Sequence, residues 1–346
     1  MSSSNDRIIQ FDALRVLAAF AVVWLHTSAQ RFYICYPSVE WNARNFYDSS
    51  VRWAVPIFIM ISGAIFLDSK KKLDLKILYS KYINRIAKIF IFWSIIYSFY
   101  GGIREKGFLD LVVRIVQGPF HFWFIKMLIG LYITIPILRI IVTDRKMEQY
   151  FICLSLATVF FIPLVSIFMG YISDTARYFV ENYNEEFGIK IALGHVGYFV
   201  LGHYLANNNT TYTVKRIICI LGIMSILAVS ILTFLISGRV GRPYLFFYEY
   251  NNVFTLFEAI SIFIVIKDIK VMPKHCAFLT NVSKLSLGIY IIHPLVMNML
   301  FDYGNIDSAS SNPIYFIPLY SLIVFMISYF VSSVLIKIPI IKNFMM

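Results

Sequence analysis

Apolar runs alternate with short polar breaks along the whole chain, and this pattern predicts the fold. The ten runs cover residues 10–32, 51–68, 84–102, 119–141, 149–170, 189–206, 216–237, 249–267, 283–301 and 314–336. A helix that crosses a lipid bilayer needs about 20 mostly apolar residues. Lipid offers no hydrogen-bond partner to the backbone, so such a run must be helical. We therefore predict an all-α integral membrane protein with about ten transmembrane helices.

The composition agrees with a membrane protein. Hydrophobic residues make up 59% of the chain and charged residues 14%, with a mean hydropathy of +0.72, outside the usual balance of soluble proteins. No polar break exceeds about 20 residues, so residues 1–346 are predicted to form a single transmembrane domain without a separate soluble domain. The first run contains Asp12 and Arg15 and lacks a small-residue cleavage site, so it does not resemble a cleavable signal peptide. We expect it to remain in the mature protein as a membrane helix.

The formal net charge of +12 would suggest nucleic-acid binding in a soluble protein. Here the basic residues gather in alternate breaks, at Lys70, Lys71, Lys72, Lys76, Lys81, Arg85, Arg139, Arg145, Lys146, Lys215, Arg216, Lys267, Lys270, Lys274 and Lys284. The other breaks carry Glu40, Asp48, Glu105, Asp110, Asp174, Glu181, Glu185, Glu186, Asp302 and Asp307. The positive-inside rule then places both termini in the cytoplasm. We expect no nucleic-acid partner, and the four scattered cysteines predict neither a disulfide nor a metal site.

Arg15 and His26 form the most informative polar pair, because both lie within the first apolar run. They stand 11 positions apart. Eleven helical steps bring two side chains to within about 20° of the same face and about 16 Å apart along the axis. Ionisable groups inside a membrane helix are costly and are candidates for a functional site. We expect the chemistry along this face, with Asp12 too far from His26 to orient it and placed to pair with Arg15.

Further ionisable residues lie within later runs, namely His121, Lys126, His195, Glu258 and His293. Counting from the run ends places these histidines, with His26, in the outer half of the membrane and Glu258 near the middle of its run. Each histidine can also be an ordinary hydrogen-bonded packing residue. Lys126 and Glu258 can instead form a buried ion pair between their helices.

Four stretches of the chain resemble one known family. RIIQFDALRVLAAFAVVWLHT (7–27) is similar to the opening of the acyltransferase-3 family of integral membrane acyltransferases, whose signature is Arg or Lys, ten residues, then His. Arg15 and His26 match it. The stretches VPIFIMISGAIFL (55–67), HFWFIKMLIGLYITIPIL (121–138) and SKLSLGIYIIHPLV (283–296) follow in the family's order. Among its members the chain resembles the single-domain bacterial enzymes that O-acetylate surface polysaccharides or lipid-linked precursors.

The resemblance implies an acyl-CoA donor, acetyl-CoA being the first choice, which is a substrate and not a permanently bound cofactor. Given such a donor, we expect Arg15, Arg85 and Lys81 to bind its phosphates and His26 to act as general base on the acceptor hydroxyl. Glu258 and His293 are the further catalytic candidates. His121, Trp123 and Lys126 are candidates for binding the acceptor or the oxyanion.

One position departs from the family pattern. Members often carry Arg-x-x-Arg at the start of the third span, whereas here Tyr82 precedes Arg85 and Lys81 is one place off. An ammonium lacks the bidentate fork of a guanidinium, so Lys81 is expected to hold phosphate less firmly.

The resemblance places the protein in the bacterial cytoplasmic membrane as a multi-pass protein, with membrane lipid, acyl-CoA and a saccharide acceptor as partners. The alternative is a polysaccharide or lipid-linked sugar exporter or flippase, in which the intramembrane ionisable residues would form a proton or substrate path. The identity of the acceptor, the length of the acyl group and the oligomeric state do not follow from the sequence.

Overall fold

The computed structural model describes residues 8–100, 107–170, 172, 173, 175, 176, 178, 180, 194–270, 272–304, 306 and 312–345. Within these residues all regular structure is helical. The helices up to the middle of the chain are α1 (Ile9–Ala29), α2 (Val39–Ser49), α3 (Ala54–Phe66), α4 (Leu75–Ile77), η1 (Leu78–Ile83), α5 (Asn84–Tyr100), α6 (Phe108–Gln117), η2 (Phe120–Phe122), α7 (Trp123–Ile141), α8 (Arg145–Ser155), η3 (Leu156–Phe161) and α9 (Ile162–Gly170). They are followed by α11 (Val196–Asn207), α12 (Tyr212–Val240), η5 (Phe246–Tyr248), α13 (Val253–Lys267), α14 (Pro273–Lys284), α15 (Ser286–Asp302), α16 (Pro313–Leu335) and α17 (Pro339–Lys342).

The all-α membrane architecture is confirmed. Within the described residues, seven helical segments are long and apolar enough to cross a membrane: Ile9–Ala29, Val39–Phe66, Phe120–Ile141, Arg145–Gly170, Tyr212–Val240, Phe246–Lys267 and Pro313–Leu335. A further pair, α14 and α15, meets at an angle of 62° and makes an eighth if counted as one bent span. The runs 84–102 and 189–206 correspond to α5 with 17 residues and α11 with 12, and residues 189–193 lie outside the described part. Ten spans and the cytoplasmic side of the termini therefore stay predictions.

The second span differs from its expected start. The run 51–68 is preceded by α2, which contains Glu40 and Asp48, two residues expected in an exposed polar break. Ser38 caps α2 by accepting a hydrogen bond from the Trp41 backbone N–H at 3.0 Å. Asp48 is 1% exposed because it faces Arg52 across one helical turn. The expected break thus contains a helix with one buried face, on which Arg44 and Asp48 are paired with other charged residues.

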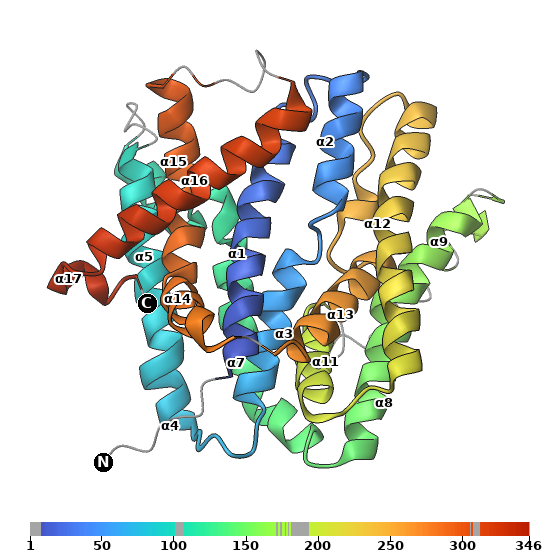
Figure 1. Ribbon diagram of the computed structural model, residues 1–346, viewed down its shortest axis with the longest axis horizontal. Coiled ribbons are helices and arrows are strands. Elements are labelled where there is room, and N and C mark those ends of the chain that lie inside the picture. The colour runs from blue at the N-terminus through green and yellow to red at the C-terminus, as the bar shows by residue number, and fades with distance from the viewer. Residues whose placement is uncertain are drawn as a thin grey trace.

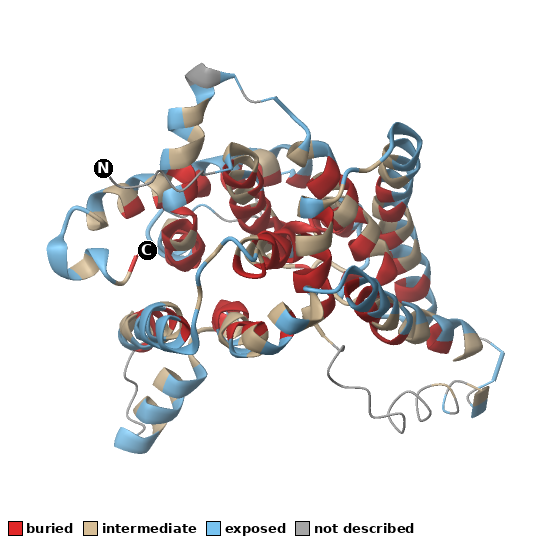
Figure 2. Ribbon diagram, turned by 90° about the horizontal axis from the view of Figure 1, so that it is seen from below, coloured by how far each residue is buried: buried red, intermediate tan, exposed pale blue. Residues whose placement is uncertain are grey.

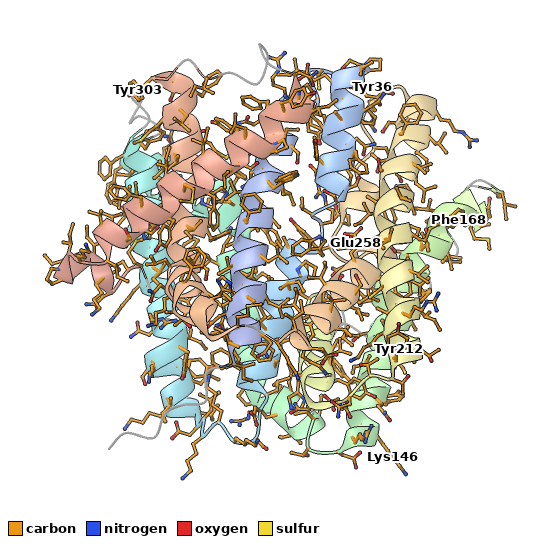
Figure 3. All side chains as sticks on the ribbon, viewed as in Figure 1. Tyr36, Lys146, Phe168, Tyr212, Glu258 and Tyr303 are labelled. Atoms are coloured by element: carbon orange, nitrogen blue, oxygen red, sulfur yellow. The ribbon has the colours of Figure 1, made fainter. Side chains whose placement is uncertain are left out.

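Residues from the two kinds of polar break lie at opposite ends of the bundle. Lys146, from a basic break, lies at one end, whereas Tyr36 and Tyr303, from two of the other breaks, lie at the other (Figure 3). Six acidic residues of the charge pattern fall outside the described residues, namely Glu105, Asp174, Glu181, Glu185, Glu186 and Asp307.

Helix α1 stands in the middle of the bundle (Figure 1). It packs against α2, α3, α13, α14, α15 and α16. Leu14, Ala18 and Val23 of α1 are completely buried, and buried residues concentrate in the centre of the bundle (Figure 2). Small residues such as Ala18 let neighbouring helices approach closely, as is usual between membrane helices. The face that carries Arg15 and His26 is therefore surrounded by protein and not by lipid.

Helices α3 and α11 are in close backbone contact. Gly63 of α3 faces the carbonyl oxygen of Phe199, and Gly202 of α11 faces that of Met60; a Cβ atom at either glycine would overlap this backbone. The two glycines lie across the same pair of helices, so neither backbone can move away without breaking the other contact. Glycine at both positions is what permits α3 and α11 to touch.

We predict that Gly63→Ala destabilises the protein by about 1–3 kcal/mol or more, because the added methyl group must push α11 away from α3. Gly238→Ala is the matched control, since a Cβ there meets no atom within 4 Å. Thermal unfolding of the two detergent-purified variants should show a lower midpoint for Gly63→Ala alone. An unchanged midpoint would mean that the two helices can separate at no cost.

Candidate active site

His26 and His293 form a hydrogen-bonded pair between α1 and α15. His26 Nδ1 lies 2.6 Å from His293 Nε2, and His293 Nδ1 lies 3.2 Å from the carbonyl oxygen of Ile289. A carbonyl only accepts, so His293 Nδ1 carries a hydrogen and its Nε2 is the acceptor. His26 then donates from Nδ1, and its Nε2 keeps a lone pair. This chain of two hydrogen bonds assigns the tautomer that a general base needs.

His121 completes a group of three histidines. Its ring centroid lies 6.0 Å from that of His293, and the Tyr290 hydroxyl donates to the His121 carbonyl oxygen. Tyr97 of α5 packs edge-on against the His121 ring at 5.2 Å. The structure therefore brings together three of the histidines that the sequence placed in the outer half of the membrane.

Asp12 anchors the other end of this face of α1. Its carboxylate lies 3.5 Å from Arg15, as expected from the spacing, and it is completely buried. It also accepts hydrogen bonds from Ser283 at 2.7 Å and Thr280 at 3.2 Å, both on α14. Asp12 thus joins α1 to α14 and holds the Arg15 guanidinium.

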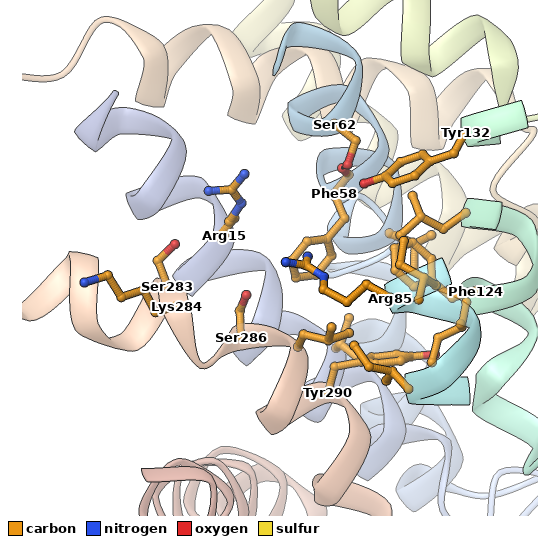
Figure 4. Close-up of a pocket in the computed structure, with 17 residues that line it drawn as sticks. Arg15, Phe58, Ser62, Arg85, Phe124, Tyr132, Ser283, Lys284, Ser286 and Tyr290 are labelled. Carbon is orange, nitrogen blue, oxygen red and sulfur yellow. The ribbon is translucent and has the colours of Figure 1, made fainter. Parts of the chain in front are cut away.

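A cavity of about 370 Å³ lies inward of the histidines. It is lined by Arg15, Val22, Val55, Phe58, Ser62, Arg85, Ile86, Ile89, Phe124, Ile125, Leu128, Tyr132, Ser283, Lys284, Ser286, Leu287 and Tyr290. Arg15 and Arg85 extend into it from α1 and α5 on facing walls (Figure 4). The cavity is therefore cationic at the end formed by Arg15, Arg85 and Lys284 and apolar toward Val22, Phe124 and Tyr290.

Lys71, which the sequence analysis assigned only to a basic loop, belongs to the cationic mouth. Its Nζ lies 3.5 Å from the centre of the Phe66 ring and 4.7 Å from that of Tyr82. Burial lowers the pKa of Lys71 to about 8, and the charges of Arg139, Lys81, Arg15 and Arg85 add to this effect. The side chain thus lies among four other cations.

Arg139 of α7 fixes the loop that carries Lys71. Its guanidinium donates to the carbonyl oxygens of Asp68 at 2.7 Å, Lys71 at 2.6 Å and Leu73 at 3.2 Å. The only sequence signal for this arrangement was the triplet Lys70–Lys71–Lys72, which predicts a cytoplasmic loop equally well. Repeated basic residues beside a span cannot reveal which of them folds inward.

The two donor candidates on the third span differ in position. Arg85 lines the cavity, whereas Lys81 is exposed and stands 5.7 Å from the Tyr82 ring. Lys81 lies in η1, a π-helical stretch that widens the turn before α5. The one-position offset of Lys81 from the family pattern thus coincides with an irregular turn. Lys81 does not line the cavity, but its charge acts on Lys71.

Glu258, Lys126 and Trp123 are not part of the histidine group. Glu258 is buried and interacts electrostatically with Arg52, while the hydrogen-bond partner of the His26 ring is His293. Lys126 is exposed and donates to the Gln117 carbonyl oxygen at 3.1 Å. No ion pair joins Lys126 to Glu258 in the described part of the chain, so that alternative is wrong.

Trp123 belongs to an aromatic cluster near the histidines. It stacks on Tyr250 with ring centroids 5.3 Å apart and an angle of 24°. The His195 ring lies 6.0 Å from the Trp123 ring, so His195 belongs to this aromatic cluster. Flat, partly exposed rings of this kind suit contact with a ligand as well as packing.

Arg52 was missed by the sequence analysis. It forms an ion pair with Asp48, donates to the Tyr248 carbonyl oxygen at 3.1 Å and lies 3.9 Å from the centre of the Tyr248 ring. Its charge acts on both Glu258 and His26. The spacing of Asp48 and Arg52 by four residues could have indicated the pair, but not its neighbours.

Comparison with known proteins adds the family. A family model described as acyltransferase domain matches residues 8–341, nearly the whole chain. The chain belongs to this acyltransferase family. The resemblance of the four sequence stretches is therefore confirmed, and membership implies a multi-pass membrane acyltransferase. No curated protein and no solved structure matched the chain.

In this acyltransferase, we predict that Lys71 titrates near pH 8, whereas an ordinary lysine titrates near 10.5. Competitive labelling with an amine-reactive reagent, read by mass spectrometry across pH 6 to 11, should show the Lys71 signal rising earlier than that of a solvent-exposed lysine. Arg139→Gln removes a neighbouring positive charge and should move the Lys71 midpoint upward. Arg216→Gln, on α12, is the control. A Lys71 midpoint that stays near 10.5 would contradict this arrangement.

Proposed function

We propose that this protein transfers an acyl group, acetyl in the first instance, from acyl-CoA at the cytoplasmic face to a hydroxyl of a surface polysaccharide or lipid-linked sugar. The observation that carries the proposal is the cavity between Arg15 and Arg85 at one end and Val22 and Tyr290 at the other, with His26 one helical turn beyond Val22. Cations at one end suit phosphates, and an apolar channel suits an extended neutral arm.

In this proposal the donor's phosphates bind at the cationic mouth. Arg15 and Arg85 supply guanidinium groups that can hold phosphate oxygens in pairs. Lys71 and Lys81 add positive charge behind them, as their mutual electrostatic contact indicates. The pantetheine arm then follows α1 outward, and the rise of about 16 Å from Arg15 to His26 sets the distance that it must span.

His26 is the proposed general base. Its Nε2 takes the proton of the acceptor hydroxyl while the hydroxyl oxygen bonds to the thioester carbonyl carbon. The C–S bond then breaks and the proton passes to the sulfur of the leaving CoA, so ester and free thiol are formed without net proton change. The hydrogen bond to His293 supports this role because it holds the His26 ring in position.

The other candidates have supporting roles in the proposal. His121 lies beside His293 and is proposed to stabilise the oxyanion. Trp123 offers its ring to the saccharide, and Lys126 supplies charge at the exposed edge. Glu258 is proposed to act through Arg52, whose charge reaches His26.

The proposed setting is the bacterial cytoplasmic membrane, as expected from the resemblance. The exporter alternative has no observation in the described residues that favours it over acyl transfer. Donor binding distinguishes the two, because an exporter of saccharides has no need of a site for a CoA ester.

The first prediction from this proposal concerns donor binding. Detergent-purified wild type should bind acetyl-CoA saturably in calorimetry, and Arg15→Ala should lose at least about tenfold in affinity through the loss of charged hydrogen bonds to phosphate. Arg216→Ala, on α12, should bind like wild type. Absence of binding by well-folded wild type would favour transport or a different donor.

The second prediction concerns catalysis. His26→Ala should lower transfer of labelled acetyl from acetyl-CoA to the polysaccharide and lipid-linked fractions of membranes by about 10²–10⁴-fold. Donor affinity should stay close to that of wild type, because His26 does not line the cavity. Transfer at the wild-type rate would remove His26 from the mechanism. Label retained on wild-type protein given donor alone would point instead to a covalent acyl-His26 intermediate.

A further inference from the structure

The cavity stops one helical turn short of all three histidines. On α1 its last residue is Val22 and the histidine is His26; on α15 these are Tyr290 and His293. On the segment that enters α7, Phe124 lines the cavity and His121 stands one turn outward. None of the three histidines is among the lining residues. A thin layer of side chains therefore separates the cavity from the proposed base.

Within this layer, Tyr290 is fixed by a hydrogen bond and by contacts with two other rings. Its hydroxyl donates to the His121 carbonyl oxygen, which ties α15 to the segment before α7. Its ring lies 5.5 Å from that of Phe124 and 6.1 Å from that of His293, and it is buried. Figure 4 shows Tyr290 at one end of the cavity, opposite Ser62. The Tyr290 ring thus lies between the cavity and the histidines, at the end of the cavity that faces His26.

We propose that Tyr290, which packs against Phe124, limits the acyl group of the donor to a short chain. This inference rests on the proposed function, since it assumes that a CoA ester occupies the cavity. A thioester that reaches His26 must pass its acyl group beside the Tyr290 ring. Two carbons fit with a small displacement, whereas a longer chain must push the ring away and break its hydrogen bond to His121.

The physical reason for discrimination is steric. A hydrophobic pocket distinguishes chains that differ by a methylene mainly when the larger one meets a wall that cannot move. Tyr290 is such a wall because it is held at both its backbone, in α15, and its hydroxyl. Specificity would thus be determined by a residue that lines the donor cavity and takes no part in the proton transfer.

The experiment is calorimetric binding of free CoA, acetyl-CoA, butyryl-CoA and hexanoyl-CoA to the full-length protein. Wild type should bind acetyl-CoA at least about tenfold more tightly than hexanoyl-CoA. Tyr290→Ala should remove this difference and leave the affinity for free CoA unchanged, because the phosphate site lies at the other end of the cavity. Tyr290→Phe should shift the preference in the same direction by less, since it keeps the ring and loses the hydrogen bond.

Tyr97→Phe is the matched control. It also removes a tyrosine hydroxyl that donates to a backbone carbonyl, that of Ile291 at 2.6 Å, but Tyr97 does not line the cavity. This variant should retain the wild-type preference for acetyl-CoA.

The outcomes separate this inference from the proposed function. Equal affinity of wild type for acetyl-CoA and hexanoyl-CoA, or an unchanged preference in both Tyr290 variants, would overturn the inference and leave donor binding intact. If Tyr290→Ala fails to fold, the direction of the Tyr290→Phe shift decides. Wild type that binds neither CoA nor its esters would overturn both proposals together.

Discussion

The hydrogen bond between His26 and His293 connects α1 to a helix that forms near the other end of the chain. In lipid an unpaired polar ring costs free energy, so each imidazole needs a partner supplied by the protein. Near the N-terminal end of α1, Asp12 accepts hydrogen bonds from Ser283 and Thr280 of α14. Because α14 and α15 meet at 62°, one bent helix pair contacts α1 at both levels. The orientation of Arg15 depends on these two attachments.

The second constraint is the concentration of positive charge at the mouth of the cavity. Arg15, Arg85, Lys81 and Arg139 all act on Lys71, and like charges brought together in a partly buried place repel. Burial is the main cause of the lowered pKa of Lys71, and the four neighbouring charges add to it. A polyanionic ligand at this place would offset the repulsion among these cations. The mouth therefore suits a ligand that carries several negative charges.

The site and the bundle are linked through helices that carry both packing and chemistry. The glycine contacts between α3 and α11 bring the Phe58 and Ser62 wall of the cavity into place. Arg52 at the start of the same span reaches His26 through its charge. A change that separates α3 from α11 would thus alter the cavity as well as the stability.

The sequence by itself determined the helices and the common face of Arg15 and His26, because both are local properties of a chain with a helical period. The pairing of Asp12 with Arg15 also followed from a spacing of three. Only the tertiary structure decided that His293 is the partner of His26, that Glu258 faces Arg52 and that Asp48 of α2 is buried. The same holds for Lys71 and Tyr290, which local patterns describe as a loop lysine and a core tyrosine. These assignments depend on which distant helices pack together, and one sequence carries no local signal of that choice.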